Sequence, residues 1–339
     1  MQIESRRFLL TGGASMIGAR TAALLLEAGA KEVVLYDNLS FDAPDEALRA
    51  LCADPRVRLH KGDVLDLPAL EAACEGMAGV FALAGFMSAG IAKNPALGLE
   101  VNIRGTHNVL QACHSLRVGK LVFASSSAAY GYGAIGGAIS EAEPFHSAGV
   151  PSPPALYGAS KVIGEQLCKL YREQHGLDYI ALRYSTVYGE RQHYRSTNAL
   201  YIIEAYDRVA QGLPPILFGD GSDTKDFVYV GDVARANLLA MASTASGEAL
   251  NISGGKPLSV KFLAETVIRL AGATMQPEYR DAPTSGFRIT TDAPFFYDNT
   301  KARERIGWSP EVGIEEGIAR MIAWRKGATD TAGTAAPAA

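Results

Sequence analysis

The feature that most constrains this chain is a glycine-rich turn near its start, set between an apolar strand and an apolar helix. Arg7–Leu10 predicts a short buried strand, the turn Thr11–Gly18 follows it, and an apolar helix over Ala19–Ala28 ends at Gly29. A strand, a glycine-rich turn and a helix in this order can bind a pyrophosphate at the helix N-terminus. The sequence therefore predicts a dinucleotide site at the start of a parallel sheet.

An acidic residue closes the next predicted strand. This strand, Glu32–Tyr36, ends at Asp37, about 20 residues after the glycine-rich turn. A carboxylate there accepts hydrogen bonds from the adenosine ribose and repels a 2′-phosphate, which favours NAD over NADP. The alternative is a strand-end turn built on Asp37 and Asn38 alone.

Strand and helix patterns then alternate through the first half of the chain. The alternation predicts an α/β fold with a Rossmann-type, doubly wound parallel sheet. Asp63, Val64, Ala84 and Gly85 fall at strand ends, on the edge where a dinucleotide lies, although each could equally serve a turn. The further expected elements are strands at Val57–His60, Gly79–Leu83, Lys120–Ala124 and Asp178–Leu182, and helices at Leu67–Met77, Pro95–Leu116 and Ala155–His175.

The pattern changes after Arg183, where shorter elements predict a smaller α/β lobe interleaved with the end of the sheet. We expect residues 1–185 and about 227–252 to form the NAD-binding domain. Residues 186–226 and 253–326 are expected to form the substrate lobe. The Ala- and Thr-rich stretch 327–339 predicts a disordered tail.

A candidate proton-transfer site stands on the helix predicted at Ala155–His175. Tyr157 and Lys161 are four residues apart, which puts both side chains on one helix face. A fixed ammonium favours the phenolate and lowers the tyrosine pKa towards the range of a general base. The alternative is a solvated helix face. The strand that ends at Ala124 runs into three hydroxyls, Ser125, Ser126 and Ser127.

Charge and cysteine spacing exclude other classes of function. The 339 residues include 32 Lys and Arg against 36 Asp and Glu, a net charge of −4, so nucleic acid or an anionic membrane is not the expected partner. No membrane-spanning run and no signal-peptide pattern is expected. The widely spaced cysteines predict reduced, mostly buried thiols in a cytoplasmic protein without a metal site. They are Cys52, Cys74, Cys113 and Cys168.

These motifs together resemble the extended short-chain dehydrogenase/reductases of the NAD-dependent epimerase/dehydratase family, and most closely its UDP-hexose 4-epimerase branch. The resemblance covers nearly the whole chain. Any one motif is weak, but all occur in order at workable spacings. Beyond those already given, they are Asn102-x-x-Gly105-Thr106, Ser126 four residues before Tyr130-Gly131, Leu182-Arg183-Tyr184, Gly219-Asp220-Gly221, Asp226-Phe227-Val228-Tyr229-Val230 and Leu250-Asn251-Ile252.

The resemblance implies a role for each candidate. Tyr157 is the acid/base, Lys161 lowers its pKa and holds the nicotinamide ribose, and Ser126 hydrogen-bonds the reacting hydroxyl. The implied NAD contacts are Gly12, Ser15, Met16, Ile17, Gly18, Asp37, Asn38, Asp63, Val64, Leu83, Ala84, Gly85, Asn102, Ser125, Tyr157, Lys161 and Tyr184. The implied substrate contacts are Ser126, Ser127, Tyr157, Thr186, Lys225, Arg288 and Phe295.

The chain departs from the family pattern at several positions. Ser15 replaces the middle glycine of the loop, and we expect an adapted site. Ala128 and Ser127 stand where dehydratases and decarboxylases carry acidic residues, which disfavours elimination and decarboxylation. Lys225 replaces the usual phosphate-binding arginine, and Thr186 replaces a common asparagine.

The resemblance implies an NAD-dependent nucleotide-sugar epimerase, acting through a 4-keto intermediate as a homodimer. A large ring at Phe295 would favour UDP-glucose or UDP-galactose over N-acetyl sugars, unless that ring is only part of the core. One alternative is a dehydrogenase or reductase of a sugar or other small alcohol with exchangeable NAD. The other is a dinucleotide-sensing protein, which would need no proton donor.

Overall fold

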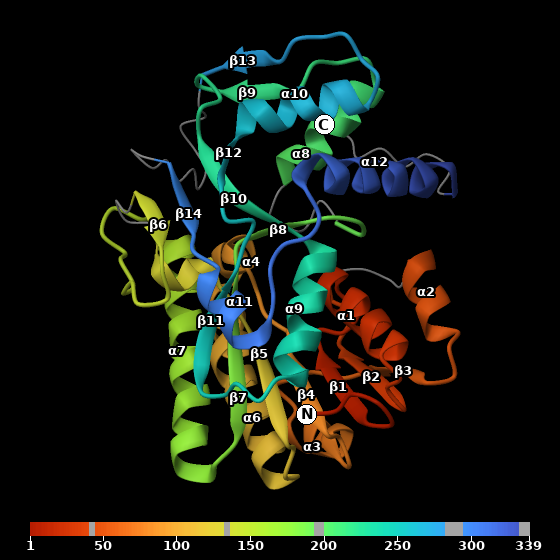
Figure 1. The fold of residues 1–339 in the computed structure, drawn as a ribbon, viewed down its shortest axis with the longest axis vertical. Coiled ribbons are helices and arrows are strands. Elements are labelled where there is room, and N and C mark those ends of the chain that lie inside the picture. The colour runs from red at the N-terminus through yellow and green to blue at the C-terminus, as the bar shows by residue number, and fades with distance from the viewer. Residues whose placement is uncertain (41–44, 132–135, 193–199, 282–293, 332–339) are drawn as a thin grey trace.

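A seven-stranded parallel sheet forms the centre of the computed structural model, which describes residues 1–40, 45–131, 136–192, 200–281 and 294–331 (Figure 1). Its strand order is β11-β7-β5-β4-β1-β2-β3. The order reverses beside β1, at the point where a doubly wound sheet binds its ligand. The strands are β1 (Arg7–Thr11), β2 (Glu32–Asp37), β3 (Val57–Lys61), β4 (Gly79–Ala82), β5 (Lys120–Ser126), β7 (Asp178–Tyr184) and β11 (Glu248–Ile252).

Apolar residues cover both faces of this sheet. Phe8 and Leu10 of β1 pack in one hydrophobic cluster, whereas Leu9 between them packs in the other. Successive side chains of a strand point to opposite faces, so a continuous apolar run is what a sheet buried on both sides requires. The prediction of a doubly wound α/β fold is confirmed.

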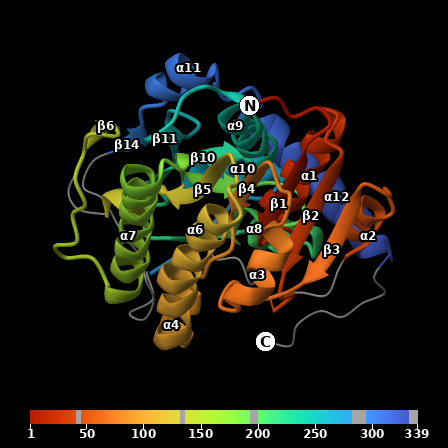
Figure 2. The same ribbon diagram turned by 90° about the horizontal axis from the view of Figure 1, so that it is seen from below.

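Helices lie in two layers, one on each face of the sheet (Figure 2). α1 (Met16–Glu27) packs against α9 (Val230–Ala242) on one face. α6 (Thr106–Ser115) packs against both α3 (Leu67–Cys74) and α7 (Ser152–His175) on the other. The remaining helices of this half are α2 (Glu46–Cys52), α4 (Ser88–Lys93), α5 (Pro95–Leu99), the π-helical segment η1 (Glu100–Gly105) and the 3₁₀ segment η2 (Ser127–Tyr130).

Short elements build the smaller lobe above the C-terminal edge of the sheet (Figure 1). Its strands form a three-stranded sheet, β12-β10-β8, and two strand pairs, β13-β9 and β14-β6. They are β6 (Gly137–Ile139), β8 (Thr186–Tyr188), β9 (Ile216–Phe218), β10 (Thr224–Tyr229), β12 (Pro257–Ser259), β13 (Glu278–Arg280) and β14 (Phe295–Tyr297). The later helices are α8 (Leu200–Ala210), α10 (Val260–Leu270), α11 (Thr300–Ile306) and α12 (Ile314–Thr331).

Apart from shifts of a few residues at element ends, the observed organisation departs from the expected one in three ways. Residues 227–229 belong to β10 of the small sheet, whereas they were expected in the cofactor domain. The single helix expected at Pro95–Leu116 contains the π-helical segment η1. α12 continues to Thr331, so the first five residues of the expected disordered tail are helical, and residues 332–339 lie outside the described part.

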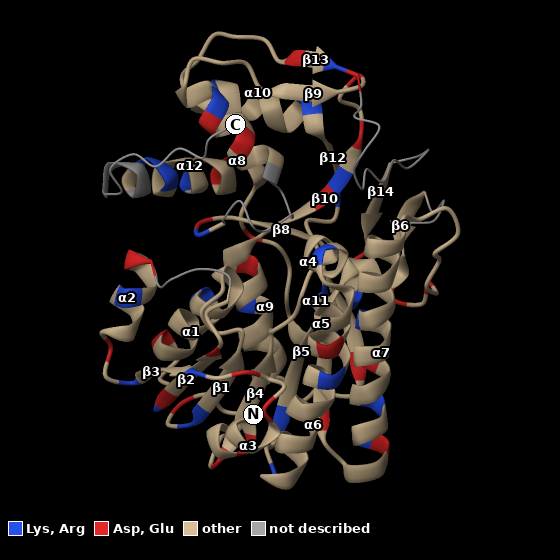
Figure 3. Cartoon of the chain, turned by 180° about the vertical axis from the view of Figure 1, so that it is seen from behind, with Lys and Arg blue, Asp and Glu red and all other residues tan. Residues whose placement is uncertain are grey.

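Charged, apolar and metal-binding side chains are distributed over the folded chain as follows. Figure 3 shows Lys and Arg interspersed with Asp and Glu over both lobes. Across the described residues, every helix is too short or too polar to cross a bilayer. Within the same residues, no three His, Cys, Asp or Glu side chains converge as metal ligands. Three of the four thiols are buried, those of Cys74, Cys113 and Cys168.

Candidate active site

Three glycines of the turn leave no space for a β-carbon. Gly12 has a φ of +66°, and a β-carbon there would lie 2.9 Å from the Ala84 backbone. A β-carbon on Gly13 would lie 2.7 Å from Cα of Leu35, and one on Gly18 would lie 2.7 Å from Gly13. The loop, the end of β4 and the start of α1 therefore pack backbone against backbone.

Ser15, the departure from the family pattern, caps α1. Its hydroxyl donates to the Gly12 carbonyl at 2.7 Å and accepts from the Gly18 N–H at 3.1 Å. The N–H groups of Met16 and Ile17 precede the first intrahelical hydrogen bond of α1, so they remain for an anion such as a pyrophosphate. The local geometry therefore fits a dinucleotide despite the missing glycine.

Asp37 ties the end of β2 to this loop. Its carboxylate accepts from the Ala14 N–H at 3.1 Å through one oxygen and from the Leu39 N–H at 2.9 Å through the other. Each oxygen keeps a lone pair for a ribose hydroxyl. The Asp37 carboxylate can therefore stabilise the strand-end turn and still accept a hydrogen bond from a ribose hydroxyl.

The neighbouring strand ends converge beside Asp37. The Asn38 amide donates to the Asp63 carboxylate at 3.1 Å, and that carboxylate also accepts from the Leu65 N–H. Val64 is buried next to Asp63, where its carbonyl accepts from the side chain of Asn108. These contacts bring the predicted adenosine-side residues together at one edge of the sheet.

The end of β4 leads from the glycine loop to Lys161. The N–H groups of Leu83 and Ala84 donate to the backbone and side-chain oxygens of Thr11. A β-carbon on Gly85 would lie 3.6 Å from Nζ of Lys161. The structure thus joins the predicted pyrophosphate and nicotinamide sides through one short segment.

Asn102 has a structural use as well as its predicted cofactor contact. Its Oδ1 accepts from the Phe86 N–H at 2.7 Å, and its Nδ2 donates to the Phe86 carbonyl and the Ser160 hydroxyl. A direct cofactor contact is left to the second lone pair of Oδ1. The π-helical segment η1 carries this side chain.

Tyr157, Lys161 and Ser126 meet at the C-terminal end of β5. The Ser126 side chain is near enough to Tyr157 to lower its pKa, and the Lys161 ammonium lies 5.8 Å from the Tyr157 ring centre. Gly158 allows this approach, because a β-carbon there would lie 2.2 Å from the Ala128 carbonyl oxygen. Substitution of Gly158 by any larger residue would push α7 away from η2.

Burial opposes ionisation at this site. Burial raises the pKa of Tyr157 above its ordinary value, and the nearby Ser126 side chain partly offsets that rise. Burial lowers the pKa of Lys161 to about 8, against an opposing effect of Glu165. Lys161 donates to the Ala124 carbonyl at 2.8 Å. The expected lowering of the tyrosine pKa by Lys161 is therefore not seen in the protein alone.

Glu165 and Arg183 hold Ser125, the first of the three serines at the end of β5. Arg183 forms two hydrogen bonds with the Glu165 carboxylate, at 2.8 and 2.6 Å, and Ser125 donates to the same carboxylate at 2.5 Å. Ser126 accepts from the Ala128 N–H at 3.1 Å, and Ser127 opens η2. Glu165 follows Lys161 by four residues, as Lys161 follows Tyr157, so the same helical spacing could have identified Glu165 as a site residue from the sequence.

Tyr184 is predicted to contact the cofactor, but its side chain is buried in the core and hydrogen-bonded there. Its hydroxyl donates to Asn237 at 2.6 Å, and Asn237 donates in turn to Thr21 of α1. Its side chain is 6% exposed. Any cofactor contact by Tyr184 would therefore come from its backbone.

The predicted substrate residues lie apart from one another along the smaller lobe. Thr186 is half-buried on β8, and Lys225 is exposed on β10. Phe295 is 8% exposed and packs against Tyr297, in a buried cluster with Tyr130 and Ile139. Arg288 lies outside the described residues.

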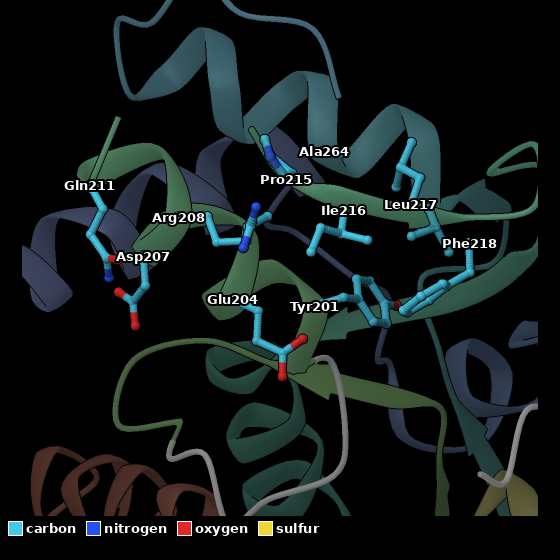
Figure 4. Close-up of a pocket in the computed structure, with 12 residues that line it drawn as sticks. Tyr201, Glu204, Asp207, Arg208, Gln211, Pro215, Ile216, Leu217, Phe218 and Ala264 are labelled. Carbon is cyan, nitrogen blue, oxygen red and sulfur yellow. The ribbon is translucent and has the colours of Figure 1, made fainter. Parts of the chain in front are cut away.

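A cavity of about 330 Å³ opens in the substrate lobe between α8, β9 and α10 (Figure 4). Apolar and aromatic side chains line one part, among them Ile216 and Phe218, and polar side chains such as Glu204 and Arg208 line the rest. The buried Tyr201 hydroxyl has no hydrogen-bond partner among the described residues. Sequence reasoning did not single out this cavity, because its walls come from three separated segments.

The fold and this geometry define a class: an enzyme that holds a nicotinamide dinucleotide at a Rossmann edge, with a tyrosine and a lysine beside it. The sequence profile of the NAD dependent epimerase/dehydratase family matches residues 8–253. The chain belongs to this family, and its cofactor is NAD.

Individual relatives cover almost the full chain. A putative UDP-glucose 4-epimerase of Methanocaldococcus jannaschii is 33% identical, with 94% of this chain and 98% of that protein covered. A UDP-glucuronate 4-epimerase of Thermodesulfobacterium geofontis is 32% identical, with 94% and 96% covered. The crystal structure of Thermotoga maritima UDP-glucose 4-epimerase with UDP-glucose has a TM-score of 0.83 at 30% identity, with 95% and 99% covered.

Proposed function

We propose that this protein is a UDP-hexose 4-epimerase that works through a 4-keto intermediate. The observation that carries the proposal is the position of Tyr157 beside the Lys161 ammonium and near Ser126, at the sheet edge where the NAD loop ends. The similarity to epimerases over nearly the whole chain supports it.

Separate residues would bind NAD, transfer the proton and orient the reacting hydroxyl. Gly12, Gly18 and Asp37 would hold NAD, and bound NAD supplies a hydride acceptor and then a hydride donor. Tyr157 takes the proton of the C4 hydroxyl as a phenolate and later returns it to the C4 oxygen, after the keto sugar has turned its other face to the hydride donor. Ser126 holds the same hydroxyl oxygen in line with Tyr157.

The pKa values explain why the site needs its ligands. Burial alone raises the pKa of Tyr157, so a phenolate in this pocket requires a nearby positive charge. Lys161 provides one such charge while it is protonated, and an oxidised nicotinamide adds another when NAD is bound. The phenolate is therefore favoured in the complex with oxidised cofactor.

The cavity beside α8 offers a place for part of the nucleotide. A mostly apolar wall at Pro215, Ile216 and Phe218 suits a planar base, and the Tyr201 hydroxyl would bond to its polar edge. Phe218→Ala should then raise KM for a UDP-sugar more than it lowers kcat. An unchanged KM would remove the cavity from the binding site.

One experiment tests the function directly. The purified protein is denatured, the released NAD is measured, and native protein is assayed on UDP-glucose and UDP-galactose. Bound NAD with interconversion of the two sugars supports the epimerase. Turnover only with added NAD would favour the dehydrogenase alternative, and NAD binding without any turnover would favour the sensor.

Assembly as a homodimer stays a proposal, with an exposed apolar stripe as its support. Leu156, Ile163 and Leu170 recur every two turns on one face of α7, each 38 to 40% exposed. Ile163→Glu should convert the dimer to a monomer in light scattering, and a wild-type monomer at micromolar concentration would reject the proposal.

We also propose that the protein is cytoplasmic, because its buried thiols form no disulfides.

A further inference from the structure

Arg191 joins the substrate lobe to the cofactor loop. It follows β8, and its side chain is only 12% exposed. Its Nε donates to the Asp45 carboxylate at 2.7 Å, its Nη1 to the Ser15 carbonyl at 3.2 Å and its Nη2 to the Ala14 carbonyl at 3.1 Å. One guanidinium therefore connects three segments of the chain.

The acceptors are the parts of the fold that would surround the adenosine half of NAD. Both peptide groups that flank the Ala14 α-carbon are held, because the Ala14 N–H donates to Asp37 and the Ala14 carbonyl accepts from Arg191. The Ser15 carbonyl also accepts from the Ala19 N–H in the first turn of α1. Asp45 caps the start of α2.

The segment that carries Arg191 is fixed at its other end to the substrate lobe. The neighbouring Glu190 carboxylate accepts from the Tyr229 hydroxyl of β10, at 2.6 and 2.7 Å to its two oxygens. Arg191 itself has a φ of +63°, a left-handed conformation that non-glycine residues rarely adopt. Such a conformation persists where surrounding contacts hold it.

We infer that Arg191 is a positioning residue that slows the release of NAD. Opening the adenosine side requires the glycine loop to move away from the start of α2, and the guanidinium ties the two together. The inference rests on the proposed function, since a 4-epimerase must keep one NAD through both hydride transfers. Its readout, the rate of NAD release, needs no sugar turnover.

The test compares NAD release from wild type and Arg191→Met. Holoprotein is mixed with excess isotopically labelled NAD, and the exchange of bound NAD is followed by mass spectrometry. Charge-assisted hydrogen bonds are lost, so release should accelerate roughly ten- to a hundredfold. Arg191→Lys, which keeps the charge without the planar fork, should fall between the two.

Two further variants separate cofactor retention from general stability. Arg56→Met removes a similar guanidinium, which pairs with Asp54 at 2.7 Å and donates to the Leu26 carbonyl, and it should leave NAD release unchanged. Asp45→Asn keeps an oxygen that can cap α2 but removes the charge, so it should accelerate release in the same direction as Arg191→Met, by a smaller factor.

The outcomes are decisive in both directions. Equal release rates in wild type and Arg191→Met would overturn the inference, even if the variant melts at a lower temperature. Exchange of the wild-type NAD within the mixing time would overturn it too. Slow release without UDP-sugar turnover would leave the retention role standing and remove the proposed epimerase activity.

Discussion

The cofactor half and the substrate lobe differ in how their polar groups are committed. At the glycine loop, Asp37 and Ser15 each make two hydrogen bonds that are already formed in the protein alone. In the substrate lobe, Lys225 is exposed, and the buried Tyr201 hydroxyl has no partner among the described residues. The polar groups of the glycine loop are therefore preorganised, whereas those two groups of the substrate lobe would gain hydrogen bonds only when a ligand binds.

This difference predicts where substitutions act. Preorganised groups cost little to bring into position, so they serve the cofactor whatever the sugar. A lobe that has polar groups without partners in the protein alone would discriminate among ligands by size and by hydrogen bonding. Changes in the cofactor half should therefore affect all sugars alike, whereas changes in the lobe should alter the preference among them.

The largest effect is expected at the junction of the two regions. Tyr157→Phe should keep the fold and NAD binding but lose ~10²–10⁴-fold in turnover with every sugar, the usual contribution of a positioned acid/base. Steady-state rates and NAD content measure the two properties separately. Activity within a few-fold of wild type would remove Tyr157 from the mechanism.

Lys161 predicts a pH dependence of stability in the cofactor-free protein. Burial lowers its pKa from 10.5 to about 8, so between these values the folded state binds fewer protons than the unfolded state. The cost of burying the ammonium is complete below pH 8 and is relieved as the pH rises towards 10.5. Relative to Lys161→Met, the wild-type free energy of unfolding should rise by up to about 3 kcal/mol across this window. Parallel denaturation curves for the two proteins would contradict it.

Asp37→Ala tests the preorganised side. Loss of the carboxylate removes the ribose acceptor and the Ala14 anchor, so NAD affinity should fall by roughly ten- to a hundredfold and discrimination against NADP should relax. Titration calorimetry with both cofactors measures the change. Unchanged affinities would make Asp37 a turn residue only.

Phe295 tests the substrate side. If its ring limits the sugar pocket, wild type should prefer UDP-glucose or UDP-galactose to the N-acetyl sugars by roughly ten- to a hundredfold in kcat/KM. Phe295→Ala should reduce that preference. Its place in the cluster with Tyr130 and Tyr297 makes a loss of stability the competing outcome. Equal turnover of plain and acetylated sugars by wild type would contradict the role.

The smallest effect is expected for Ser15→Gly. Glycine is nearly as good an N-cap as serine, so the cost to α1 should be only a few tenths of a kcal/mol. Access of the backbone to the pyrophosphate improves, and NAD affinity should hold or rise slightly. A large loss of affinity would show that the Ser15 hydroxyl itself contacts a phosphate.

Particular residues show how far prediction from sequence could reach. The turn before Gly18, the acidic end of β2 and the Tyr157–Lys161 spacing were all recognisable, because each depends on residues close together in the chain. Asn102 and Tyr184 stay predicted cofactor contacts, and the structure adds that their side chains bond Phe86 and Asn237. Those partners lie in other elements, which no local pattern reveals.

The sequence by itself therefore determined the fold class, the family and the cofactor, since alternating apolar segments and short glycine motifs encode them locally. Only the tertiary structure decided how the polar groups pair. It placed Ser126 against Tyr157, Glu165 against Arg183, and Arg191 on the glycine loop some 176 residues away. Such pairings satisfy buried polar groups across the core, and they are fixed by packing that brings distant segments together.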